Sequence, residues 1–265
     1  MSAAKSWGRM RAIARRHALA LKRSPHRFFD VTIWPVVDCL LFGTIGIFAQ
    51  QRGGGALAAG YLLVGVVLWH VIYQAQIALS TGFLEETWTR NLLNLMVTPI
   101  TELEYAAGVA LFGFVKLLMG VGLVALTAFV FYAFDITVLG IGAIPVVAIL
   151  LSIGWIIALF VIGLVMRFGT GAEALAWGIL FAIMPLSGVF YPVDALPGVL
   201  QPIALALPTT HAFEAGRGLL DGRGMLWGEL GVAALSTVFF AAVTVWFLGR
   251  MLAMFRRRGY ITRYS

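Results

Sequence analysis

The sequence is poor in cysteine, in charge and in nucleotide-binding motifs. Its single cysteine, Cys39, can form no disulfide within the chain, so the fold cannot depend on an oxidised framework. Charged residues make up only 12% of the 265 residues, whereas soluble domains carry about 25%. No G-x-x-x-x-G-K-S/T loop is present to hold phosphates. These shortages argue against an ordinary soluble domain, and any ATP hydrolysis would need another polypeptide.

Apolar residues dominate instead. Hydrophobic side chains make up 61% of the sequence and the mean hydropathy is +0.94, which is typical of a polytopic membrane protein. A helix needs about 20 apolar residues to cross a bilayer, and all but the fifth of six apolar runs approach or exceed that length. The runs are residues 31–49, 57–79, 106–133, 141–166, 175–190 and 228–249. We therefore expect an all-α membrane protein with six transmembrane helices in a single domain over residues 31–249.

Lysine and arginine gather at the two ends of the chain, and such residues favour the cytoplasmic side. Eight precede the first run: Lys5, Arg9, Arg11, Arg15, Arg16, Lys22, Arg23 and Arg27. Five follow the last run, in a basic tail over residues 250–265: Arg250, Arg256, Arg257, Arg258 and Arg263. Six spans place both termini in the cytoplasm. Topology and anionic headgroups thus explain the net charge of +7 better than nucleic-acid binding does.

The basic segment over residues 1–30 has the pattern of an amphipathic helix. Apolar side chains recur at spacings of three and four, at Trp7, Met10, Ala14, Ala18 and Leu21. Basic side chains fill much of the remainder. The pattern predicts a cytoplasmic helix lying on the inner leaflet, either as a membrane anchor, which we favour, or as a lipid sensor.

A second cytoplasmic segment joins the second and third runs. Thr81 can cap a helix whose first turn holds Glu85 and Glu86, near the positive end of the helix dipole. One face of this helix is apolar, with Phe83, Leu84, Trp88, Leu92, Leu95 and Met96. Pro99 ends it. We expect a separate short helix over residues 82–98 that either rests on the bilayer or docks a soluble partner.

The stretch over residues 190–208 is apolar but broken by four prolines. They are Pro192, Pro197, Pro202 and Pro208. It is too short and too kinked to span as one helix, because lipid cannot replace the backbone donors that proline removes. A seventh span here would also turn the C-terminal arginines outward, against the usual charge bias. The stretch is therefore expected to re-enter or to line the rim on the outer side.

Isolated polar residues indicate no reaction centre. We expect Asp38 to pair with Lys116 or a tail arginine, and His70 to be a hydrogen-bonded interior histidine rather than a metal ligand, since no second ligand shares its face. His211 and Ser187 lack the G-x-S-x-G setting of a hydrolase. The chain is thus expected to be no enzyme, with no catalytic residue, metal site or cofactor of its own.

Two stretches together resemble the membrane subunit of a type-2 ATP-binding-cassette exporter. In the first, the pair Glu85-Glu86 is followed by N-L-M-V-T-P at residues 94–99. In the second, P-L-S-G-V-F-Y-P at residues 185–192 is followed by L-P at residues 196–197 and L-P-T-T-H-A-F-E-A-G-R at residues 207–217. Order, spacing and six-span topology agree over nearly the whole chain.

The resemblance implies a working unit of two permeases and two cytoplasmic ATPase subunits in the bacterial cytoplasmic membrane, with ATP and Mg on the ATPase. It implies that residues 82–98 form a coupling helix and that residues 190–208 form an extracellular re-entrant helical hairpin. The residues implied in coupling are Glu85, Glu86, Trp88, Arg90, Leu92, Met96 and Pro99. Those implied in the extracellular gate are Pro185, Gly188, Phe190, Tyr191, Pro192, Pro197, Pro208, His211, Glu214 and Arg217.

Two classes of function stay open. The first is the permease of an ATP-driven exporter that moves a hydrophobic or amphipathic cargo outward, such as a drug, a lipid or a lipid-linked glycan. The second is a stand-alone secondary transporter or lipid-modifying membrane protein. The absence of a convincing internal repeat, of paired buried ionisable groups and of an acid, base or metal cluster favours the first. The sequence does not choose among cargoes.

Overall fold

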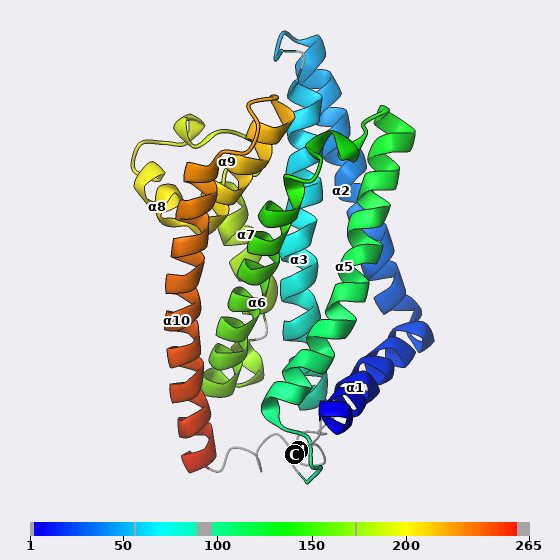
Figure 1. The fold of residues 1–265 in the computed structure, drawn as a ribbon, viewed down its shortest axis with the longest axis vertical. Coiled ribbons are helices and arrows are strands. Elements are labelled where there is room, and N and C mark those ends of the chain that lie inside the picture. Colours follow the sequence, from blue (N-terminus) through cyan, green and yellow to red (C-terminus); the bar gives the residue numbers. More distant parts are fainter. Residues whose placement is uncertain (1–2, 56, 89–96, 173, 259–265) are drawn as a thin grey trace.

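The computed structural model describes residues 3–55, 57–88, 97–172 and 174–258, and in these ranges the chain is all-helical, as the sequence predicted (Figure 1). The α-helices are α1 Ala3–Arg23, α2 Pro25–Gln51, α3 Ala58–Trp88, α5 Glu102–Tyr132, α6 Ala143–Phe168, α7 Leu175–Leu186, α8 Gln201–Ala206, α9 Pro208–Leu220 and α10 Trp227–Arg258. Short 3₁₀ turns are η1 Ile136–Leu139, η2 Thr170–Ala172 and η3 Val193–Ala195.

Five helices of the described ranges are long and apolar enough to cross a membrane. Their candidate spans are Val31–Gln51, Ala58–Glu86, Leu103–Tyr132, Ala143–Phe168 and Trp227–Met254. The fifth predicted run forms α7, which has only 12 residues. At 1.5 Å per residue α7 is about 18 Å long, whereas the hydrocarbon core is about 30 Å thick. The described helices thus provide five spans of full length and one shorter apolar helix.

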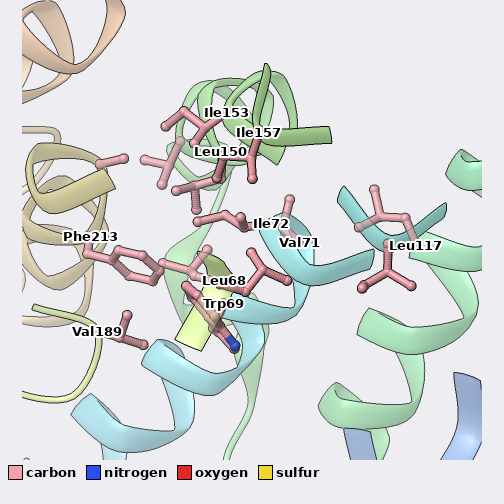
Figure 2. Close-up of a cluster of buried hydrophobic side chains, with 14 of the residues drawn as sticks. Leu68, Trp69, Val71, Ile72, Leu117, Leu150, Ile153, Ile157, Val189 and Phe213 are labelled. Atoms are coloured by element: carbon pink, nitrogen blue, oxygen red, sulfur yellow. The ribbon is translucent and has the colours of Figure 1, made fainter. Parts of the chain in front are cut away.

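Helix α3 lies at the centre of the molecule, with α2 and α5 on one side and α6, α7, α9 and α10 on the other (Figure 1). Figure 2 shows Leu68 and Ile72 of α3 among side chains of α6 and α9, including Leu150 and Phe213. All four are buried. Helix α1 lies beside the foot of α5, at the end where α10 finishes, and α8 and α9 lie at the opposite end (Figure 1).

The structure corrects the expected start of the coupling helix. Helix α3 continues without a break to Trp88, and the Thr81 hydroxyl donates to the Ile77 carbonyl at 2.6 Å instead of capping a new helix. No proline interrupts this stretch, so nothing in the backbone forces the span to stop at residue 79. Residues 82–88 are therefore the last two turns of α3, and residues 89–96 lie outside the described ranges.

Helix α5 begins at Glu102, four residues before the expected start at residue 106. Its first turn is closed by a capping box: the Glu104 amide donates to the Thr101 hydroxyl at 3.2 Å, and the Thr101 amide donates to the Glu104 carboxylate at 3.0 Å. The T-x-x-E pattern at residues 101–104 is a sequence signal for this boundary that hydropathy alone does not contain.

The turn at residues 187–192 packs closely against α3, and this packing can be tested by a substitution at Gly65. A Cβ atom on Gly65 would overlap the carbonyl oxygen of Val189, and a backbone atom cannot swing aside as a side chain can. Gly65→Ala should therefore destabilise the fold by about 1–3 kcal/mol. Gly122→Ala, with nothing within 4 Å of the added atom, is the matched control. Thermal unfolding in detergent should show a lower melting temperature for the first variant only, and equal melting temperatures would contradict this packing.

Candidate functional site

The acidic pair at the C-terminal end of α3 faces the N-terminal helix of the same chain. The Glu86 side chain is fully buried and forms an ion pair with Arg16 of α1. The Glu85 carboxylate lies 3.7 Å from Nδ1 of His17, also on α1. Glu86, one of the residues expected in coupling, is therefore covered by α1 of the same chain. Its neighbour on α1 was not part of the sequence prediction.

Helix α1 packs tightly on the start of α5. Ile13 and His17 are buried, the His17 ring stacks on Phe112 at 5.8 Å, and Arg9 forms an ion pair with Glu104 at 3.2 Å. Gly108 of α5 allows the close approach, since a Cβ there would lie 2.8 Å from the carbonyl oxygen of Met10.

The buried side of α1 differs from the predicted apolar stripe. Trp7, the first residue of that stripe, is 54% exposed, whereas His17 is almost fully buried. Hydropathy counts His17 and the arginines as solvent-facing, but here carboxylates of α3 and α5 pair with Arg16 and Arg9, and the Glu85 carboxylate lies beside His17. The remaining stripe residues are partly buried or exposed, so the described part of the chain does not fully cover that side of α1.

The other residues expected in coupling are only partly described. Trp88 ends α3 and Pro99 is exposed in the turn before α5. Arg90, Leu92 and Met96 lie outside the described ranges. The end of α3, the turn at residues 97–100 and α1 occupy the same end of the bundle (Figure 1).

At the opposite end, Arg217 of α9 joins the two C-terminal motifs. It is buried, one guanidinium nitrogen donates to the Gly188 carbonyl, and two donate to the Glu214 carboxylate at 2.8 and 3.0 Å. Gly188 has φ of +61°, a left-handed conformation that favours glycine. Burial raises the pKa of Glu214, but hydrogen bonds and charge from Arg217 and Arg223 outweigh it and hold this pKa below its usual range. The two motifs thus form one structural unit.

Three residues outside the motifs extend this network. Arg223 donates to Glu214 at 3.2 Å and to Asp221 at 2.8 Å, and the Tyr61 hydroxyl donates to Asp221. Tyr61 belongs to the first turn of α3, so the network ties α9 to the N-terminal end of the central helix. No local pattern marks these residues, because Tyr61 and Asp221 are 160 positions apart.

His211 holds α9 to its neighbours. Its Nδ1 lies 2.7 Å from the Glu229 carboxylate of α10 and its Nε2 lies 2.9 Å from the Leu205 carbonyl. Each ring nitrogen therefore has a hydrogen-bonding partner, one on α10 and one in the segment just before α9. Ser187 donates to Ile183 at 2.8 Å and therefore accepts from Thr209 at 2.7 Å. His211 and Ser187 are each committed to other partners and form no nucleophile–base pair with each other.

The aromatic residues of the predicted gate also contact specific partners in the chain. The Phe190 ring stacks on Phe42 of α2 at 3.9 Å, and the Tyr191 hydroxyl donates to the Pro185 carbonyl at 2.8 Å. The prolines have different places: Pro192 precedes η3, Pro197 is exposed in the following turn, and Pro208 is the buried first residue of α9.

A further polar pair lies inside the bundle. Asp38 of α2 has a carboxylate oxygen 3.6 Å from Nε2 of His70 on α3, a neighbour that the sequence did not suggest. His70 is buried, as expected, and its ring stacks on Tyr73 at 5.8 Å, but the expected hydrogen bonds are not formed, since neither ring nitrogen has a hydrogen-bond partner in the described part of the chain. Lys116, the expected neighbour of Asp38, is buried on α5. Within the described ranges no group of three His, Cys, Asp or Glu residues is placed to hold a metal ion.

Comparison with protein families matches residues 9–220 to the family described as ABC-2 type transporter. Comparison with curated proteins found no match. Membrane domains of this family are permease components that lack the ATPase site, and the family implies a partner ATPase subunit. The matched region covers most of the chain, including most of α1, the acidic pair and both C-terminal motifs, and the chain therefore belongs to the ABC-2 type transporter family as a multi-pass transmembrane subunit of an ABC transporter.

Proposed function

We propose that this chain is the permease of an ATP-driven exporter that moves a hydrophobic or amphipathic cargo, such as a drug, a lipid or a lipid-linked glycan, outward across the bacterial cytoplasmic membrane. Two copies pair with each other and with two cytoplasmic ATPase subunits, which bind ATP and Mg. Both termini lie on the ATPase side. The family match, the basic ends of the chain and the lack of a phosphate-binding loop support this assignment.

One observation carries the mechanism: α3 is a single unbroken helix between the two polar clusters. Glu86 at its inner end pairs with α1, and Tyr61 at its outer end bonds to Asp221. The 25 residues between Tyr61 and Glu86 correspond to about 38 Å of rigid helix. The hydrogen-bonded group of Tyr61, Asp221, Glu214, Arg217 and Arg223 is called the outer network below. A displacement at the ATPase side moves α3 as one rigid body and therefore reaches this network, as in rigid-body transitions between two packed states. Nucleotide bound more tightly to the closed ATPase state supplies the driving free energy.

Two contacts support re-entry of the segment between α7 and α8, because each contact lies well inside the end of a spanning helix. Phe190 stacks on Phe42, nine residues before the outer end of α2 at Gln51, which is about 13 Å along the helix. Val189 lies against Gly65, seven residues from the start of α3. The segment between α7 and α8 thus reaches inward between spans, where it can act as the extracellular gate.

Pairing of two copies along α2 is supported by the exposure of Asp38. Its side chain is 35% exposed at the eighth of the 21 residues of the candidate span Val31–Gln51, on the side of α2 that also carries exposed Trp34 and Leu41. A carboxylate facing hydrocarbon at that depth costs a few kcal/mol or more. The cost is avoided if this side of α2 faces the second copy and the pathway between the two.

The coupling role of the Arg16–Glu86 pair can be tested in vesicles containing the chain and its ATPase partner. Glu86→Arg leaves two cations together in a buried site and should weaken the docking of α1 by about 3–5 kcal/mol. Cargo export and cargo-stimulated ATP hydrolysis should fall, while the exchanged pair Arg16→Glu with Glu86→Arg should recover a large part of both. Arg52→Glu, at the exposed C-terminal end of α2 and away from α1, is the matched control. Unchanged export in Glu86→Arg, or no ATP-dependent export by the unaltered complex, would refute the proposal.

Pairing along α2 can be tested by cysteine crosslinking, starting from Cys39→Ala, which removes the only cysteine. Leu41→Cys on α2 should give a disulfide-linked dimer in oxidised membranes, because it lies on the side assigned to the second copy. Leu118→Cys on α5 is similarly exposed, at 59% against 53%, and should stay monomeric. Non-reducing electrophoresis distinguishes the two. A dimer through Leu118→Cys alone would place the second copy on α5 instead.

The outer network should make stability depend on pH through Glu214. Its pKa is lower in the folded chain than the ordinary value of 4.5, so the ionised form favours folding. This contribution is complete above the ordinary value and is lost as pH falls through the lower folded value. Melting temperatures of the purified chain should therefore drop more steeply on acidification than those of Glu214→Gln. Asp194→Asn, in the exposed part of the same region, should keep the original slope; equal slopes for all three would remove Glu214 from the pH response.

A further inference from the structure

A cavity of about 260 Å³ lies between α6, α7 and α10 and is closed at one end by the start of α9. Twelve residues line it, and ten of them are apolar. The two exceptions are Thr209 on α9 and Thr244 on α10. None of the residues assigned to coupling lines it, and of the gate residues only Pro208 does.

The cavity lies at the depth of the bilayer centre. Ile156 is the fourteenth of the 26 residues of α6, and Phe240 is the fourteenth of the 28 residues in the candidate span of α10. Both line the cavity near the middle of a spanning helix. The medium around such a position is lipid hydrocarbon, so the cavity is in contact with acyl chains rather than with water.

The shortness of α7 explains why a space remains there. Helices α6 and α10 have 26 and 32 residues, whereas α7 has 12 and its chain turns away after Leu186. Over part of their length, α6 and α10 therefore have no third helix beside them. The junction of α8 and α9, at Leu207 and Pro208, closes the outer end of the gap.

Water does not suit this space. A buried water needs two to four polar partners, and the Thr209 hydroxyl is already committed to Ser187 at 2.7 Å. An empty space is also unfavourable, because its apolar walls lose dispersion contacts on one side. In a bilayer the hydrocarbon chain is the local solvent, and filling the space by packing does not depend on escape from water.

We propose that the cavity binds one acyl chain of a membrane phospholipid in each subunit. The chain lies between α6 and α10 with its end against Leu207, Pro208 and Thr209. It thereby supports the first turn of α9, the helix that carries Glu214 and Arg217 of the outer network. This resident lipid is independent of the cargo and of the ATPase partner, so its presence does not depend on the proposed export function.

The binding is tested with the purified chain in nanodiscs made of a phosphatidylcholine that carries a diazirine in the middle of one acyl chain. After illumination, labelled residues are mapped by mass spectrometry. Residues 153–160 and 240–244 should carry about tenfold more label than the exposed α5 positions Phe129 and Phe131, as expected for a site about 1.4 kcal/mol more favourable than the bulk lipid contact. Equal labelling of the cavity and these exposed positions would overturn the proposal.

A matched pair of variants makes the assignment specific. Val243→Trp places an indole in the cavity and should lower labelling of residues 153–160 about fivefold, since the displaced chain loses its packing contacts. Val245→Trp, on an exposed side of the same helix, should leave it unchanged. Equal labelling in the two variants would contradict a chain bound in the cavity.

A measurement on the unaltered chain keeps the proposal testable if Val243→Trp does not fold. Illumination after detergent extraction and washing should still label residues 153–160, whereas Phe129 and Phe131 should lose their label with the bulk lipid. Loss of both labels would exclude a resident chain. Loss of the cavity label only on addition of a transported cargo would assign the cavity to cargo and overturn its assignment to membrane lipid.

Discussion

The structure depends on close packing of neighbouring helices against α3. Three of the neighbours contribute a glycine at the point of approach: a Cβ on Gly120 of α5, Gly154 of α6 or Gly216 of α9 would lie 2.7 Å or less from atoms of Gln74, Ala75 and Leu68, respectively. Hydrophobic burial drives little association between helices inside lipid, so dispersion contacts between closely approached backbones must supply it. The glycines therefore fix α3 as the axis around which the other helices are placed.

A central helix held in this way connects the two ends of the molecule. The acidic residues of α3 lie near its C-terminal end, at Glu85 and Glu86, and at its N-terminal end Tyr61 bonds to Asp221. Charged groups are less costly near the ends of a span than at its centre. The ion pairs therefore determine which elements are held to the ends of α3, whereas its buried middle, which also contains His70, Gln74 and Gln76, is held by packing.

Much of the fold and of the outer site was predictable because the relevant signals are local. Apolar run length located the spans, and two short motifs identified Gly188, Glu214 and Arg217, which the structure brings together. The docking of α1 was not predictable in this way. Arg16 and Glu86 are 70 positions apart, and hydropathy treats each as a surface residue although each compensates the charge of the other. The length of α7 was also missed in part, since an apolar run does not reveal where a helix ends.

The burial of Glu86 changes how force can reach α3 under the proposed function. A fully buried carboxylate offers no contact area, so an ATPase must act on what covers it or on the chain that follows Trp88. The covering element is α1, whose outward side carries Arg11 and Arg15 while Arg9 and Arg16 hold it to α5 and α3. The surface that receives the ATPase is therefore composite. The acidic pair recognised in the sequence serves to hold that surface to the central helix.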